Sequence, residues 1–251
     1  MKNKKINNYY KKKGVVYKIC APFVRLFYKK VEFIGLENLP KEPCVIAGNH
    51  AQMHGPANAE LNFPTKKLIW CDGPMMVRKE FPKYAYNNFF GGKPNFFQKI
   101  FVRLLTPLIT TIFNSADALP VYRDMRIVKT YKLSTEALDN GANIVILPEC
   151  PDEFNEITNK FNEYFVDVAR VYYKQCKKEL SFVPMYYCRE LKKTLFGKPI
   201  KFNASEPIEK ERKRICEYLM AEITSLAKTL PPHKVIPFNP VKKKDFKMSK
   251  Q

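Results

Sequence analysis

The sequence predicts an α/β fold in which helices flank a central mixed sheet, with an amphipathic helix at the N-terminus. Short apolar runs of the kind found in buried strands alternate along the chain with longer stretches of helical periodicity. With 251 residues, 45% of them hydrophobic, the chain can build a sizeable core. Neither an internal repeat nor a low-complexity linker interrupts residues 14–233, so we predict a single domain there.

The N-terminal helix is predicted over Val15–Tyr28, where Val16, Ile19, Phe23 and Phe27 recur every three or four residues. Strands are predicted at six apolar runs bounded by turn residues or helices, namely 31–34, 44–47, 68–71, 118–121, 144–147 and 182–186. Further helices are predicted over 96–114, 125–139, 161–178 and 207–228, and Pro207 opens the last of these.

The chain is strongly basic, with 44 Lys and Arg against 24 Asp and Glu and a net charge of +20. Residues 1–13 contribute +6 and residues 234–251 contribute +5, and we predict both as solvated basic tails, the alternative being a specific recognition element. Such a surplus calls for an anionic partner. The body of the chain has neither a recognition-helix motif nor an aromatic RNA-binding signature, so we predict no specific nucleic-acid partner.

The seven cysteines are scattered and include no C-x-x-C pair, which argues against a disulfide framework and indicates a reducing compartment. Lys18 interrupts the apolar stretch at 14–26, so a secretory signal is not expected. No apolar run reaches the roughly 18 residues that span a bilayer. The sequence therefore predicts a cytoplasmic protein that lies on the cytoplasmic face of the membrane without crossing it.

The stretch Phe96–Phe113 is apolar nearly all round, yet it carries Lys99, Arg103 and Pro107. It is either a core helix on one face of the sheet or an interfacial helix whose cations reach lipid head groups. The basic helix at 15–28 favours the second interpretation, and we therefore expect a membrane surface with anionic lipids as a partner. The oligomeric state is left open.

Two of the three histidines follow the predicted strand at 44–47, in the segment Gly48-Asn49-His50-Ala51-Gln52-Met53-His54-Gly55-Pro56. In open α/β sheets, ligands bind beyond the carboxyl ends of the strands. His50 is therefore a candidate general base, since an imidazole that titrates near neutrality can accept a proton from a hydroxyl group. The alternative is a histidine that only caps the next helix.

The sequence gives less support to two other kinds of site, a zinc site and a cysteine nucleophile. His50 and His54 have the four-residue spacing of a zinc-binding pair, but Gly55-Pro56 disfavours a helix through both and Ala51 stands where a Glu is expected, so we predict no metal. Cys150 lies on a strand-end loop and is either a nucleophile or a small structural cysteine; no signature supports the nucleophile.

Three further segments place a polar group or a turn at the end of a predicted strand: Leu119-Pro120-Val121-Tyr122-Arg123, Ile146-Leu147-Pro148-Glu149 and Phe182-Val183-Pro184-Met185. Together with Asn49-His50, this series resembles the glycerolipid acyltransferases, the superfamily of glycerol-3-phosphate and lysophosphatidate acyltransferases. Phe33-Ile34-Gly35-Leu36-Glu37-Asn38-Leu39-Pro40 and Phe196-Gly197-Lys198-Pro199-Ile200 resemble the family's lead-in and its late strand. The resemblance extends over roughly residues 25–230.

The resemblance implies an O-acyltransferase that moves a fatty acyl group from acyl-CoA or an acyl-carrier protein to a hydroxyl of a lysophospholipid-like acceptor. No cofactor is expected beyond that acyl-donor co-substrate. His50 would deprotonate the hydroxyl, Arg123 would hold the acceptor phosphate, Glu149 would accept hydrogen bonds from the acceptor's hydroxyls and Pro184 would shape the pocket. Asn49 accompanies the base, with its role left open.

The chain departs from the family pattern at Gly55, where the family has the Asp that orients the imidazole. Either His54, Glu60 or Asp72 replaces that Asp, or a backbone carbonyl accepts the ring N–H; the sequence does not choose. The alternative hypothesis is a catalytically silent relative that binds lipid or acyl chains. Cys150-Pro151-Asp152 follows Glu149 in place of Gly-Thr and a polar or basic residue, which favours an acceptor other than plain lysophosphatidate or a loss of activity.

Overall fold

The computed structural model describes residues 13–28 and 31–249, so residues 1–12 of the predicted N-terminal tail lie outside the described residues. The chain divides into two compact units. A smaller unit takes the residues up to Phe27 together with Leu68–Leu133, and a larger unit takes Tyr28–Lys67 and the chain from Ser134 onward. We predicted one domain over 14–233. Each unit combines two separate stretches of chain, so no linker composition marks the division.

The larger unit contains a mixed sheet in the order β1 (Glu32–Ile34), β9 (Lys193–Phe196), β8 (Ser181–Cys188), β2 (Val45–Gly48) and β5 (Asn143–Ile146). Strands β8, β2 and β5 run parallel to one another, β9 runs antiparallel to β8, and β1 runs parallel to β9. The short β10 (Ile200–Lys201) pairs antiparallel with β8. Strand β2 is buried along its whole length, which fits its unbroken apolar sequence.

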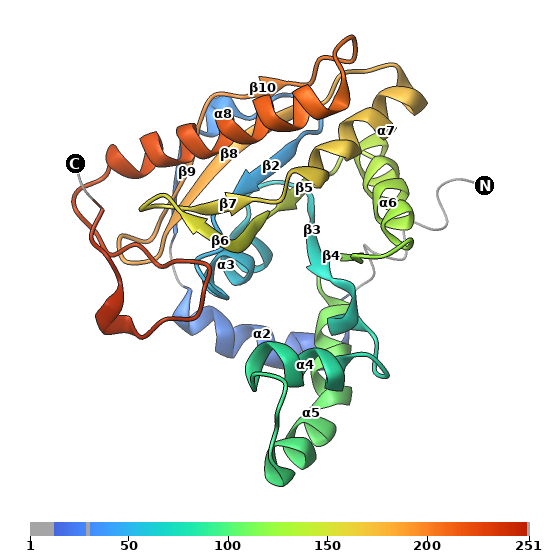
Figure 1. Cartoon of the computed structure of the whole chain (residues 1–251), viewed down its shortest axis with the longest axis vertical. Coiled ribbons are helices and arrows are strands. Elements are labelled where there is room, and N and C mark those ends of the chain that lie inside the picture. The colour runs from blue at the N-terminus through green and yellow to red at the C-terminus, as the bar shows by residue number, and fades with distance from the viewer. Residues whose placement is uncertain (1–12, 29–30, 250–251) are drawn as a thin grey trace. The chain divides into compact units, whose positions relative to one another are not determined.

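Helices α3 (His54–Asn62) and α8 (Ile208–Lys228) cover opposite faces of this sheet. On one face, Asn58 of α3 donates a hydrogen bond to the Thr194 hydroxyl at 3.1 Å. On the other, the space beside Gly197 is bounded by side chains of α8, including Leu226. Side chains alternate along a strand, so positions 194 and 197 face opposite sides. The predicted α/β class, with helices flanking a mixed sheet, is confirmed (Figure 1).

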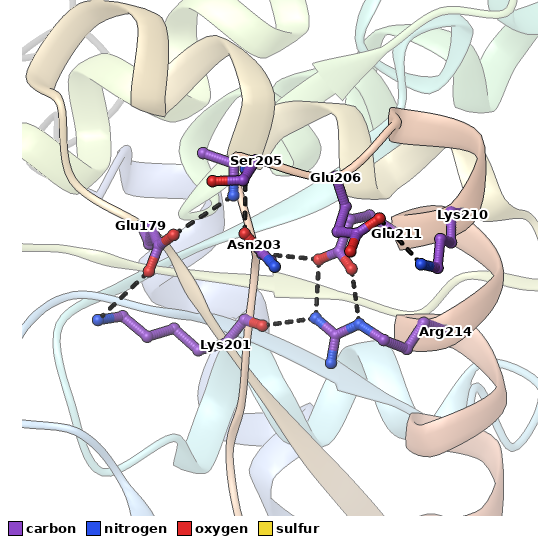
Figure 2. A network of polar contacts seen from close by, with 9 residues as sticks. Glu179, Lys201, Asn203, Ser205, Glu206, Lys210, Glu211 and Arg214 are labelled. Carbon is purple, nitrogen blue, oxygen red and sulfur yellow. Dashed lines mark hydrogen bonds and ion pairs between the residues drawn. The ribbon is translucent and has the colours of Figure 1, made fainter.

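A polar network fixes the start of α8 (Figure 2). Glu211 is fully buried and accepts hydrogen bonds from Arg214 at 2.6 Å and from the Asn203 backbone N–H at 2.7 Å. Burial alone would raise the pKa of Glu211, but these hydrogen bonds and the Arg214 charge hold that pKa below its usual value. The carboxylate is therefore ionised and ties α8 to the segment after β10.

The predicted helix at 161–178 is shorter than expected. The structure has a hairpin of β6 (Glu149–Phe154) and β7 (Asn159–Phe161), then the 3₁₀ turn η3 (Glu163–Val166) and helix α7 (Asp167–Cys176). The side chain of Asn162 accepts a hydrogen bond from the Tyr164 N–H and so ends the strand, and Lys177 adopts a left-handed φ of 57° that ends α7.

The smaller unit contains α2 (Val15–Phe27), the parallel pair β3 (Lys67–Asp72) and β4 (Ala118–Val121), the turn η2 (Gly73–Met76), α4 (Phe81–Phe89) and α5 (Phe96–Ser115). Helix α6 (Ile127–Asp139) crosses the boundary between the units. Asn95 and Gln98 form a capping box that starts α5, and α4 and α5 pack through a small core of Phe81, Ala85 and Val102.

Helix α5 leaves most of its apolar surface uncovered within the described residues. It is 20 residues long, and by length and composition alone it is apolar enough to cross a membrane, with 17% of its most apolar window buried. The sequence prediction that no apolar run is long enough treated Lys99 and Arg103 as interruptions, but even with charged residues the most apolar window of α5 has a mean hydropathy of 1.4. The low burial argues against the core-helix interpretation.

The C-terminal segment from 231 to 249 lies along the larger unit (Figure 1). Its lysines are exposed, whereas His233, Val235 and Ser249 are buried. The predicted solvated tail therefore holds apolar and hydrogen-bonding side chains that pack, interleaved with lysines that do not.

Candidate active site

Asn49 extends strand β2 and fixes the start of the histidine loop. Its side-chain amide donates to the Tyr187 carbonyl at 3.1 Å and its Oδ1 accepts from the Tyr187 N–H at 2.7 Å, so the side chain pairs with β8 as a backbone peptide would. Asn49 is buried. His50 therefore begins at a fixed point at the carboxyl end of β2, where an α/β sheet presents its ligand-binding edge.

The loop after His50 turns a backbone carbonyl toward the imidazole. Ala51 and Gln52 both have left-handed backbone angles, with φ of 46° and 53°. In this conformation the Gln52 carbonyl contacts Nδ1 of His50. A carbonyl only accepts hydrogen bonds, so Nδ1 carries a proton, and in the neutral imidazole the ring lone pair is then on Nε2. Two non-glycine residues in this region cost roughly 1–2 kcal/mol each, a strain typical of functional loops.

Gly55 is required by the same loop. A Cβ at this position would lie 2.5 Å from the His50 carbonyl oxygen and 2.8 Å from the Asn49 carbonyl oxygen. Backbone atoms cannot rotate away as a side chain can, so no side chain fits there without moving the loop. The backbone of this loop thus accounts for the glycine at position 55. Of the groups that the sequence left open to orient His50, a backbone carbonyl, that of Gln52, contacts the imidazole.

The other candidate replacements have different partners. Glu60 forms an ion pair with Lys67 at 3.0 Å, and Asp72 of the smaller unit accepts a hydrogen bond from the Tyr84 hydroxyl at 2.9 Å. Cys150 directs its thiol to the Lys160 carbonyl at 3.0 Å, across the β6–β7 hairpin. Among the described residues, no group of three His, Cys, Asp or Glu side chains is placed to hold a metal ion.

His54 is the first residue of α3, and both of its ring nitrogens form hydrogen bonds. Arg189 donates to Nε2, so the proton is on Nδ1, which lies 2.6 Å from the Tyr28 hydroxyl. Burial, reinforced by the charges of Arg189 and Lys243, lowers the pKa of His54 to about 4. His54 was predicted as a catalytic residue. In the structure it is a neutral link between Tyr28 and Arg189, and its catalytic role stays a prediction.

Glu149, the first residue of β6, holds the histidine loop through its side chain. Its Oε2 accepts from the His50 backbone N–H at 2.5 Å and its Oε1 accepts from the Asn159 N–H at 2.7 Å. Burial raises the pKa of Glu149 to about 7, against the opposing effect of these two hydrogen bonds. The resemblance implied that Glu149 holds acceptor hydroxyls. In the structure each carboxylate oxygen accepts one backbone hydrogen bond, and one of the two fixes the His50 backbone N–H. A carboxylate has about four lone-pair sites, so the binding of acceptor hydroxyls by Glu149 stays a prediction.

The other two residues implied by the resemblance lie on different elements. Pro184 is buried in β8 opposite Ala47 of β2, and its ring lies beside Gly197 on the face that α8 covers. Arg123 is exposed and follows β4 in the smaller unit, whereas His50 and Glu149 belong to the larger one. Within the larger unit, the structure thus brings Asn49, His50 and Glu149 together.

Asn159 and Phe238 contribute to this site and were not predicted from the sequence, and the backbone carbonyl that the sequence left open as an acceptor could not be assigned to Gln52. A backbone carbonyl has no residue-type signature. Asn159 lies on a hairpin that was not predicted, and Phe238 lies in a segment predicted as a tail. Its ring contacts that of His50 edge-on, with centroids 5.0 Å apart and an interplanar angle of 80°. The available signal was Phe238 itself, because an aromatic side chain in a lysine-rich segment indicates that part of the segment packs against the fold.

No family model matches this sequence, and no curated protein matches it. Among solved structures, the chain is similar to the 1-acyl-sn-glycerophosphate (LPA) acyltransferase PlsC from Thermotoga maritima, at 13% sequence identity and a TM-score of 0.47. The match covers 84% of this chain and 78% of that one. A likeness this distant assigns neither an activity nor a residue role to this chain.

Proposed function

We propose that this protein is an O-acyltransferase that moves a fatty acyl group from acyl-CoA or an acyl-carrier protein to a hydroxyl of a lysophospholipid-like acceptor. One observation carries the proposal. The histidine at the carboxyl end of β2 is held by a backbone carbonyl in the tautomer whose Nε2 accepts a proton.

In this mechanism Nε2 of His50 takes the proton of the acceptor hydroxyl as its oxygen attacks the thioester carbonyl. The C–O bond forms, and the resulting tetrahedral intermediate collapses by breaking the C–S bond. The thiolate leaves and takes the proton back from the imidazolium, so the products are the acylated acceptor and a free thiol. No metal and no covalent enzyme intermediate are required.

The orienting group is neutral here. Disabling the orienting Asp of a serine protease lowers kcat by about four decades, because the carboxylate fixes the tautomer and stabilises the imidazolium. The Gln52 carbonyl fixes the tautomer, but its oxygen carries only a partial negative charge with which to stabilise the imidazolium. We therefore expect slower turnover than in enzymes that have the carboxylate, but through the same proton transfer.

The test is thiol release from acyl-CoA or acyl-carrier protein in the presence of lyso-lipids. His50→Ala is expected to lower the rate by roughly 10²- to 10⁴-fold. Lys174→Ala, on the exposed side of α7, is the matched surface control and is expected to behave as wild type. Release of thiol that does not need the acceptor, or that survives in His50→Ala, contradicts the proposal.

The alternative hypothesis, a catalytically silent protein that binds lipid or acyl chains, makes the opposite prediction in the same assay. It was motivated by the missing Asp, and it expects lyso-lipid or acyl-CoA binding with no thiol release by the wild-type protein. Measuring binding by calorimetry on the same samples separates the two hypotheses.

The acceptor phosphate has two candidate cations, one in each unit. The resemblance implies Arg123, which is exposed after β4. Arg189 lies directly after β8, half-buried beside His54, and its guanidinium donates to a neutral imidazole. A guanidinium binds phosphate through two parallel hydrogen bonds. If either holds the phosphate, its replacement by Ala raises KM for a phosphorylated acceptor and leaves KM for the acyl donor unchanged.

We further propose that the smaller unit binds the cytoplasmic face of a membrane containing anionic lipids. Helix α2 packs against α5, and both expose large apolar side chains, with Phe27 76% and Phe97 80% exposed. Residues 15–27 and 81–115 contain no acidic residue and carry basic ones, including Lys99 and Arg103. This combination is typical of interfacial helices.

Vesicle flotation tests the membrane proposal. Binding to vesicles with phosphatidylglycerol is expected to exceed binding to pure phosphatidylcholine, and Phe97→Asp is expected to lower both. Extraction by alkaline carbonate is expected, because a surface-bound protein is released whereas a spanning one is not. Retention after carbonate treatment would indicate that α5 crosses the bilayer.

A further inference from the structure

The C-terminal segment is a closed loop whose two ends are fastened together on the larger unit. Ser249 donates its backbone N–H to the His233 carbonyl at 2.8 Å, and the Val235 N–H donates to the Lys247 carbonyl at 2.8 Å. Residues 234 and 248 pair as an isolated antiparallel bridge. A loop of this length with joined ends is a compact Ω-type loop.

The base of this loop is anchored in the core. His233 is fully buried, and its Nε2 lies 2.7 Å from the Tyr186 hydroxyl on β8. Its Nδ1 lies 2.8 Å from the Pro231 carbonyl, and its backbone N–H donates to the Ser249 hydroxyl at 3.1 Å. Since β8 is the central strand next to β2, the loop is tied to the strand beside the histidine segment.

The middle of the loop reaches His50 by two routes. The Phe238 ring meets the imidazole edge-on at 5.0 Å, and the Phe238 backbone N–H donates to the Asn159 Oδ1 at 3.4 Å. The Asn159 N–H donates to Glu149, whose other oxygen accepts from the His50 N–H. The ring and the backbone of His50 are thus joined to Phe238 in one closed circuit of contacts.

We infer that Phe238 is a positioning residue for His50 and that the C-terminal loop completes the site. This inference rests on the proposed function, in which His50 is the base. The Gln52 carbonyl fixes one nitrogen of the imidazole, and the T-shaped contact with the Phe238 ring restricts the plane in which the imidazole lies. An aromatic edge contact of this kind favours one orientation without adding a group that competes for the proton.

Phe238→Ala removes the contact and opens one side of the imidazole. We expect kcat of acyl transfer to fall by roughly ten- to hundredfold with KM nearly unchanged, because misorientation of a base acts on the transition state. We also expect His50 to react faster with diethyl pyrocarbonate, measured by peptide mass spectrometry. Only three histidines are present, so each modified site is readily assigned.

Phe246→Ala is the matched control, since Phe246 is half-buried in the same loop and its ring makes no aromatic contact within the described part of the chain. Phe238→Leu also removes the aromatic contact but keeps most of the side-chain volume, and it replaces the alanine variant in the test if that variant does not fold. Equal reactivity of His50 in the Phe238 variants and in Phe246→Ala overturns the inference. A difference in His50 reactivity in a protein that releases no thiol leaves the positioning role intact and removes the proposed function instead.

Discussion

Introducing an Asp at position 55, where the acyltransferases that the sequence resembles have one, is the sharpest test of this site, because the motif and the structure predict opposite outcomes. From the motif alone, Gly55→Asp is expected to complete a His–Asp dyad and raise kcat. The structure places a Cβ at this position 2.5 Å from one backbone carbonyl oxygen and 2.8 Å from another. The new carboxylate would also be held next to the partial negative charge of those oxygens.

The expected change in the free energy of unfolding of the position-55 variants is the sum of two opposing effects. Gly55 lies in the first turn of α3, where alanine would gain up to about 1 kcal/mol from helix propensity. Overpacking against immovable atoms costs about 1–3 kcal/mol and sometimes more. We expect Gly55→Ala to destabilise the fold by about 2 kcal/mol and Gly55→Asp by about 3 kcal/mol, a Tm decrease of about 4–12 °C for a chain of this size.

Thermal unfolding by calorimetry and thiol release measure the two consequences. Gly91→Ala is the control, since a Cβ there meets nothing within 4 Å and only its φ of 59° opposes the substitution. That variant is expected to lose about 1 kcal/mol. The reasoning is refuted if Gly55→Asp is as stable as wild type and faster in acyl transfer, because the loop would then have room for the family's dyad.

Three further predictions concern the polar groups of the larger unit. Because burial raises the pKa of Glu149 to about 7, the folded state holds this proton more tightly than the unfolded state, so this residue makes stability fall as pH rises from about 4.5 to 7. In Glu149→Gln that part of the pH dependence is expected to vanish in urea titrations at several pH values, with a loss of about 1–3 kcal/mol because an amide N–H₂ faces a backbone donor. Arg189→Ala is expected to raise the pKa of His54 from about 4 toward its usual value, measured by NMR titration of the imidazole; an unchanged pKa would assign the whole shift to burial. Glu211→Gln is expected to cost about 2 kcal/mol in urea unfolding, because the Asn203 N–H and the half-exposed Arg214 lose a charged acceptor. Since the pKa of Glu211 is lowered, the stability that this residue contributes is lost as pH falls below the usual pKa of a Glu carboxyl.

Local patterning was sufficient for most elements. The apolar run at 118–121 is β4, and the periodic stretch predicted at 96–114 is α5 with one residue more. Helix α8 begins one residue after the predicted position because Pro207 is its N-cap. The β6–β7 hairpin was missed because its strands are polar, and a run such as Glu149–Phe154 lacks the apolar content that identifies buried strands.

By itself, the sequence determined the α/β class, the place of His50 after a buried strand and the basic, aromatic composition of α2 and α5, because all of these depend on residue type and near-neighbour spacing. Only the tertiary structure decided what orients the imidazole. The Gln52 carbonyl contacts His50 because of the local backbone angles, whereas Glu149 and Phe238 contact it from positions up to 188 residues away in the chain. Local periodicity reports neither backbone angles of this kind nor long-range contacts.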